Sequence, residues 1–236
     1  MLYYFLSIML HVDIISVQPQ MFGGFLSESI VMRASKKGAC EINIVDLKEY
    51  GIGRWRKTDD KPYGGGPGML MRCEPVFAAV EKSLSASTSQ KRPRVILTSP
   101  AGKKFTQRDA ESLAQEEHIV FICGHYEGLD ARIETLATDM YSVGDFVMTG
   151  GEIAAAAMTD ATVRLLPGVL GGGKAATSSE SFSQEGLLEF PQYTHPVEFR
   201  GMKVPDVLLS GNHAKIEAWR KSESLRLTAK RRPDLV

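Results

Sequence analysis

Short apolar runs alternate with helix-like stretches along most of this 236-residue chain. The runs at residues 11–16 (HVDIIS), 94–98 (RVILT) and 118–123 (HIVFIC) have the length and apolar character of buried strands. Strands that alternate with helices predict an α/β fold with a parallel sheet, because parallel neighbours need a crossover that is normally helical. With 43% hydrophobic residues, the chain can form a substantial core in one or two domains.

Periodicity and turn signals predict the remaining elements. Thr106 is a candidate N-cap, with Asp109 three residues further on. Residues 51–71 are expected to form a long loop, and residues 171–185, rich in Gly, Ser and Thr, a flexible linker without fixed order in the free protein. Further helices are predicted at residues 18–35, 74–86, 106–116, 130–137, 151–166 and from 204 onward, and further strands at 42–46 and 139–143.

Three glycine-rich segments lie close together in the sequence, at residues 62–69 (PYGGGPGM), 122–128 (ICGHYEG) and 142–152 (SVGDFVMTGGE). None of them matches a GxGxxG or GxxxxGK[ST] phosphate loop. The second and third follow strand-like runs, where glycine lets a ligand approach the backbone closely. Such loops read a ligand through main-chain N–H and C=O groups, so a nucleoside-like ligand is favoured over a bare phosphate.

The formal net charge is zero, so no global basic field indicates a nucleic-acid partner. From Lys215 to the end, however, seven Lys or Arg stand against three acids. This basic C-terminal stretch is compatible with phosphate contact, although the charges alone favour a solvated surface helix.

Cysteine usage and the N-terminal sequence bear on the compartment. Cys40, Cys73 and Cys123 are far apart and have no CxxC spacing, which disfavours disulfides and zinc and suits a reducing cytoplasm. The apolar start MLYYFLSIML is too short to span a membrane and lacks a positive n-region, so neither a membrane span nor a signal peptide is expected, and Met9 is a second candidate start. No His or Cys spacing indicates a metal site.

Spacing alone assigns no catalytic residue. An arginine near the C-terminal end of an apolar helix, such as Arg164, usually interacts with the helix dipole or lies on the surface. An acid in a serine-rich loop, such as Glu180, is usually solvated. Glu127 and Asp145 lie inside glycine loops, where a carboxylate can accept hydrogen bonds from a purine edge or a ribose. For Asp145 a turn-stabilising contact is an equal alternative.

Six segments in fixed order resemble the bacterial tRNA (guanine-N1)-methyltransferases, and the resemblance extends from about residue 11 to residue 235. These segments are residues 62–69, 97–107, 122–132, 141–152, 164–171 and 204–220. The resemblance implies a trefoil-knotted, S-adenosylmethionine-binding domain over residues 1–170, a linker at 171–185 and a small helical tRNA-binding domain over 186–236. It also implies a homodimer with a shared active site, and methyl transfer to N1 of guanosine 37 in tRNAs that carry guanosine at position 36.

Site residues follow from the same resemblance. Glu180 corresponds to the family's general base, Arg164 to the arginine that stabilises charge on guanine O6, and Glu127 to a residue linked to guanine recognition. The family is described as magnesium-dependent, yet the sequence offers no dedicated metal cage. The residues expected to hold the methyl donor are Pro100, Gly124, Tyr126, Gly128, Ser142, Val143, Gly144, Met148, Gly150 and Gly151.

The sequence departs from the family pattern at several positions. Glu180 stands where an aspartate is usual, His125 where an arginine is common, and Ala154 where a proline is common, and the linker is one residue longer on each side of Glu180. Two alternatives stay open at this level: a knotted methyltransferase that acts on another RNA base, and an RNA-binding protein without catalytic activity.

Overall fold

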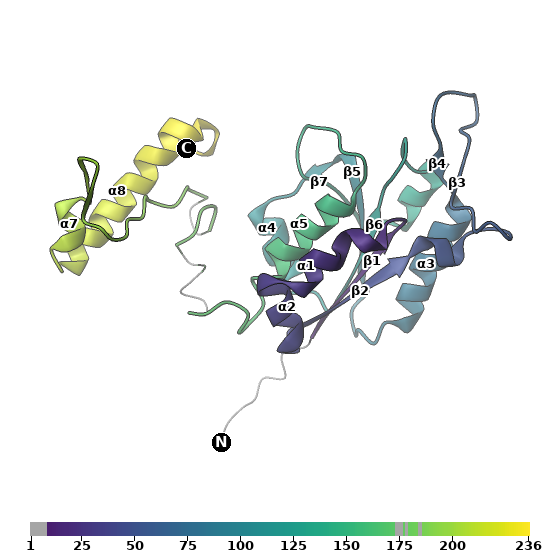
Figure 1. Cartoon of the computed structure of the whole chain (residues 1–236), viewed down its shortest axis with the longest axis horizontal. Helices are drawn as coiled ribbons and strands as arrows, with labels where there is room; N and C mark the ends of the chain where they lie inside the picture. Colours follow the sequence, from purple (N-terminus) through teal and green to yellow (C-terminus); the bar gives the residue numbers. More distant parts are fainter. Residues whose placement is uncertain (1–8, 173–176, 178, 184–185) are drawn as a thin grey trace, which may run out of the picture. The chain divides into compact units, whose positions relative to one another are not determined.

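The computed structural model describes residues 9–172, 177, 179–183 and 186–236, and the chain divides into two compact units, Met1–Gly171 and Gly172–Val236. The first eight residues, and with them the question of Met9 as a start, lie outside the described residues. Figure 1 shows a central sheet in the first unit, and a long helix with shorter elements in the second.

Five parallel strands form the sheet of the first unit, in the order β2-β1-β6-β5-β7. The prediction of an α/β fold with a parallel sheet is therefore confirmed. Strand β5 runs past the predicted end at Thr98, because after a bulge its residues Lys103 and Lys104 pair with β7 again. The strands are β1 (Leu10–Ser16), β2 (Cys40–Asp46), β5 (Arg94–Lys104), β6 (His118–Cys123) and β7 (Asp139–Ser142).

Helices cover both faces of this sheet (Figure 1). Alternation along β6 sends Ile119 and Phe121 to one face and Val120 and Ile122 to the other, so the strand has no exposed side. The first face packs against α1 (Gly23–Ser27), α2 (Ser29–Lys36), α4 (Gln107–Leu113) and α5 (Glu152–Val163). The second packs against α3 (Cys73–Ala86) and the 3-10 turns η2 (Leu47–Tyr50) and η3 (Ala131–Leu136).

Several predicted helices differ in the structure. The helix predicted over residues 18–35 is a 3-10 turn, η1 (Pro19–Phe22), followed by α1 and α2, because Glu28 is extended and Ser29 has a positive φ of 56°. The helix predicted at 130–137 is the 3-10 turn η3. The loop predicted at 51–71 contains a short antiparallel pair, β3 (Asp59–Asp60) and β4 (Leu70–Met71). Thr106 is confirmed as the N-cap of α4, with a complete capping box.

The second unit is built around α8 (His213–Arg231), preceded by α7 (Asp206–Leu209). The main-chain N–H of Leu188 donates to Thr228 Oγ1 at 2.9 Å, which ties an extended segment to this helix. A hairpin of β8 (Glu198–Phe199) and β9 (Met202–Lys203) was not predicted, since two-residue strands carry no periodicity. Its turn residues Arg200 and Gly201 both have positive φ, as a type I′ turn requires.

A partly buried polar cluster joins β1 to its neighbours β2 and β6. Nε2 of His118 lies 3.2 Å from Asp13 Oδ2, and Asn43 donates to Asp13 Oδ1 at 3.1 Å. Burial opposes ionisation of Asp13, but hydrogen bonds from His118, Asn43 and Ser83 outweigh it and lower the pKa of this carboxyl. The ionised carboxylate is thus part of the folded state.

Replacing this carboxylate by its isosteric amide should destabilise the protein in a pH-dependent way. Because the folded pKa of Asp13 is depressed, its contribution is present above its unfolded pKa of about 4 and is lost as pH falls through the folded value. We expect Asp13→Asn to lower the free energy of unfolding by about 1–3 kcal/mol at pH 7, and by less at pH 3, in urea titrations. Glu41→Gln, which alters the exposed His11–Glu41 pair, is the matched control with little effect. Equal losses for Asp13→Asn at both pH values would contradict this assignment.

Candidate ligand site

A cavity of about 320 Å³ lies beside the bulge of β5 and the carboxyl ends of β6 and β7. Parallel α/β sheets bind ligands at this edge. The lining comes from residues 97–100 at the β5 bulge, from residues 124–130 and Glu134 after β6, and from residues 141–144, 146–151 and 154 between β7 and α5.

Main-chain contacts hold the three segments together. The N–H of Gly151 donates to the C=O of Gly124 at 2.7 Å, and an antiparallel bridge joins His125 to Gly150. Thr98 Oγ1 donates to the C=O of Ile122 at 3.1 Å. A Cβ atom on Gly151 would lie 1.9 Å from Thr98 Oγ1 and 3.0 Å from the nitrogen of Gly124. Only glycine therefore allows this approach of the β5, β6 and β7 segments.

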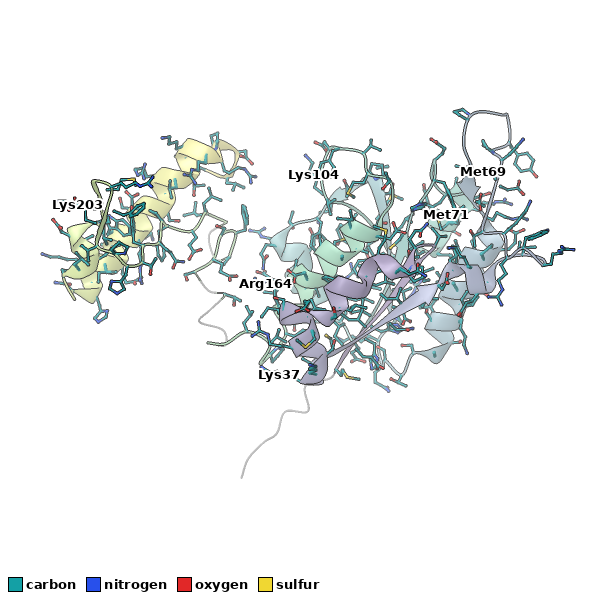
Figure 2. The ribbon with its side chains drawn as sticks, in the orientation of Figure 1. Lys37, Met69, Met71, Lys104, Arg164 and Lys203 are labelled. Atoms are coloured by element: carbon teal, nitrogen blue, oxygen red, sulfur yellow. The ribbon has the colours of Figure 1, made fainter. Side chains whose placement is uncertain are left out.

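The first glycine-rich segment supports the second from outside the cavity lining. The N–H of Glu127 donates to the C=O of Met69 at 3.1 Å, and the N–H of Met71 donates to the C=O of Gly128 at 2.9 Å. Figure 2 labels both methionines, beside the loop that precedes α3. A Cβ atom on Gly68 would lie 2.2 Å from Cγ of Glu127, so close packing fixes the start of that side chain.

The third glycine-rich segment presents apolar side chains to solvent. Val143, Phe146 and Val147 line the cavity and are exposed, and Tyr126 from the second segment is 43% exposed beside them. Asp145 is not among the lining residues, since its carboxylate pairs with Lys104 Nζ at 2.6 Å on the surface. Of the two roles considered for Asp145, ligand contact is not supported by this geometry.

Acidic groups dominate the charged lining of the cavity. Glu127, Asp130 and Glu134 contribute carboxylates, and His125 is the one titratable nitrogen group among the lining residues. Hydrogen bonds from the side chain and the main-chain N–H of Arg132 hold the pKa of Asp130 well below its usual range. The cavity therefore suits a ligand that carries positive charge.

All ten residues expected to hold the methyl donor line this one cavity, and so does Glu127. Their contact with a ligand stays a prediction. Sequence reasoning missed Thr98 and Glu152, which support the cavity from the β5 bulge and from the start of α5. A polar residue at the end of a buried strand or next to a glycine pair was the available signal for both.

The two expected catalytic residues lie outside the lining. Arg164 is the C-cap of α5, twelve residues after Glu152, which corresponds to about 18 Å along the helix axis (Figure 2). Glu180 belongs to the second unit. Its C=O accepts from the N–H and Oγ of Ser183 at 3.2 and 2.6 Å, and the N–H of Phe182 donates to the C=O of Leu187 at 2.7 Å.

The remaining expectations concern the linker, metals and membranes. Residues 173–176, 178 and 184–185 of the expected linker lie outside the described residues, so its predicted lack of order stays a prediction. Among the described residues, no group of three or more His, Cys, Asp or Glu is arranged to hold a metal ion. No helix within the described ranges has the length and apolar character needed to cross a membrane.

The cavity lies at the edge of the sheet where parallel α/β folds bind ligands. The family described as "tRNA (Guanine-1)-methyltransferase TrmD" matches residues 10–236 of the chain. Proteins named tRNA (guanine-N(1)-)-methyltransferase are similar over almost the whole length: that of Listeria welshimeri is 53% identical over 95% of this chain and 91% of its own. Those of Shouchella clausii and Geobacillus kaustophilus are 52% identical, over 95% and 96% of this chain and 91% of their own. The chain belongs to this family.

A methyl group at Gly151 should separate the loops around the cavity. We expect Gly151→Ala to lower the thermal unfolding midpoint by several degrees, since overpacking against Thr98 Oγ1 costs about 1–3 kcal/mol. Gly24→Ala is the matched control, because its added Cβ meets nothing within 4 Å. Differential scanning calorimetry compares the two variants, and an unchanged midpoint for Gly151→Ala would contradict the tight approach.

Proposed function

We propose that the protein transfers a methyl group from S-adenosylmethionine to N1 of guanosine 37 in tRNAs that carry guanosine at position 36. The observation that carries this proposal is the match of residues 10–236 to the tRNA (guanine-1)-methyltransferase family, together with a single cavity formed by the loops that the family resemblance names. The family match favours a guanine-N1 enzyme over one that acts on another RNA base.

The cavity fits the proposed methyl donor. Its volume of about 320 Å³ lies in the range of small-molecule sites. Glycine-rich loops and apolar walls suit an adenosine, and the carboxylates of Glu127, Asp130 and Glu134 complement a cationic ligand. When bound, the donor supplies an electrophilic methyl group on a sulfonium sulfur. Pro100, Ser142 and Gly144 would contact the adenosine and methionine parts from the cavity walls.

The chemistry required of the protein is proton removal and charge stabilisation. Guanine N1 carries a proton at neutral pH, and its lone pair becomes nucleophilic only when that proton leaves. The Glu180 carboxylate accepts it as general base, with one methylene more than the aspartate usual in the family. Negative charge then develops on O6, where the guanidinium of Arg164 donates hydrogen bonds. Glu127 accepts hydrogen bonds from the guanine edge.

The wider assembly is proposed on the same basis. The family resemblance supports a trefoil knot built from the segments that line the cavity. Arg164 lies outside the cavity lining and a full helix away from Glu152, which supports a homodimer whose active site uses both chains. The basic C-terminal part of the second unit would bind the tRNA anticodon stem-loop. Three free cysteines suit a cytoplasmic location.

Methyl transfer should depend on both the guanosine at position 36 and the Glu180 carboxylate. With radiolabelled S-adenosylmethionine, we expect methylation of a transcript with guanosine at 36 and 37 and none with adenosine at 36. Glu180→Gln should reduce the rate by about 10²–10⁴-fold, because proton transfer is lost, and Glu180→Asp should retain most activity as the matched control. A Glu180→Gln rate equal to wild type would place the base elsewhere.

A shared active site predicts rescue between two inactive variants. Glu127→Gln impairs guanine binding at the cavity, and Glu180→Gln removes the general base. If the base comes from the partner subunit, a mixed dimer contains one site with both changes and one site with neither. We expect co-refolded mixed dimers to recover about half of the wild-type rate per dimer, in a methyl-transfer assay after tag-based separation. No recovery above the two parent homodimers would place cavity and base in the same protomer.

A further inference from the structure

Glu152 is a buried carboxylate that the proposed reaction does not use. It is 2% exposed and begins α5. The fully buried hydroxyl of Ser16 donates to its Oε1 at 2.8 Å. Its second oxygen, Oε2, makes no hydrogen bond to any part of the chain that the structure describes. A buried carboxylate oxygen without a hydrogen bond costs free energy, so the group that faces Oε2 affects the stability of this region.

The group that faces Oε2 is the imidazole of His125. Its Nδ1 atom lies 3.5 Å from Oε2, and this nitrogen is also buried and without a hydrogen bond among the described residues. A protonated imidazole makes this contact an attractive ion pair in a region of low dielectric. In a neutral ring, Nδ1 carries either a lone pair, which repels the carboxylate, or an N–H group, whose dipole attracts it more weakly than a full charge does. The charge on His125 therefore decides the strength of the contact.

The His125–Glu152 contact lies directly over the glycine pair that closes the cavity. A Cβ atom on Gly150 would lie 2.2 Å from Glu152 Oε2 and 2.5 Å from His125 Nδ1. The backbone of His125 forms the bridge to Gly150, and its ring packs edge-on against Tyr126, with centroids 5.0 Å apart. A shift of the imidazole would thus move both the bridge and the Tyr126 wall of the cavity.

We propose that His125 is a positioning residue whose imidazolium, paired with buried Glu152, holds the segment 124–128 against Gly150 in the form that binds the methyl donor. This inference rests on the proposed function and extends it, because it makes donor affinity depend on the charge at position 125. The charged imidazole is the binding-competent form, so a permanent cation at position 125 should preserve donor affinity and a neutral side chain should reduce it.

The other titratable groups around the pair do not supply the missing charge. From β6, Cys123 is fully buried, and burial together with Glu152 raises the pKa of its thiol, which therefore stays neutral. From β1, the uncharged Ser16 donates a hydrogen bond to Glu152. Glu127 on the same loop and Asp130 and Glu134 across the cavity are acids, so they add negative charge. The ion-pair contact that the structure shows for Glu152 is the one with His125.

Calorimetric titration with S-adenosylhomocysteine tests this inference. We expect His125→Gln, which removes the charge that faces Glu152, to raise the Kd about tenfold. His125→Arg keeps a permanent charge and should bind about as tightly as wild type. His11→Gln, which alters the exposed histidine–glutamate pair on β1, should keep the wild-type Kd.

A second readout uses the protein without ligand. Hydrogen exchange of a peptide covering residues 122–130 should be faster in His125→Gln than in wild type, and not faster in His125→Arg. Wild-type affinity retained in His125→Gln, or weak binding by His125→Arg, would overturn the inference. If wild type fails to bind S-adenosylhomocysteine at any pH, the proposed function fails, whereas the exchange data still decide the role of His125.

Discussion

The cavity depends on one main-chain hydrogen bond, from the N–H of Gly151 to the C=O of Gly124. It brings the segment after β7 against the segment after β6, and only a residue without a side chain fits there, beside Thr98. The next residue, Glu152, begins α5, so the same contact fixes where this helix starts. Packing of α5 on the sheet then follows, because Ala155 and Met158 are buried in the core on that face.

Much of this arrangement was predictable from the sequence. The predicted strands matched four of the five sheet strands closely. The signal was clearest for β6, because a strand buried on both faces is apolar along almost its whole length. The helix at residues 74–86 and the cap at Thr106 followed from local rules. The glycine loops were recognisable because glycine is retained where backbones or ligands approach closely, and the family resemblance added roles that spacing alone did not.

The differences arise where long-range contacts decide the conformation. Nothing local shows that β5 resumes pairing at Lys103, since its partner Tyr141 is distant in sequence. The break at Glu28 and Ser29 divides a segment whose composition favours one helix. The His125–Glu152 contact joins residues that are separated by 27 positions (152 − 125), and each alone looks like an ordinary loop or helix-start residue.

The bulge in β5 limits where insertions and deletions can occur in the sequence of this protein. Residues 99–102 leave the ladder at Thr98 and must return to pair at Lys103, so the segment that forms one cavity wall has both ends anchored in the sheet. A Cβ atom added to Gly102 would lie 2.6 Å from the main-chain nitrogen of Tyr141. This wall consequently has no spare length. Variation in chain length is expected in connectors such as residues 87–93, whereas the cavity can change only through substitution of the side chains that face it.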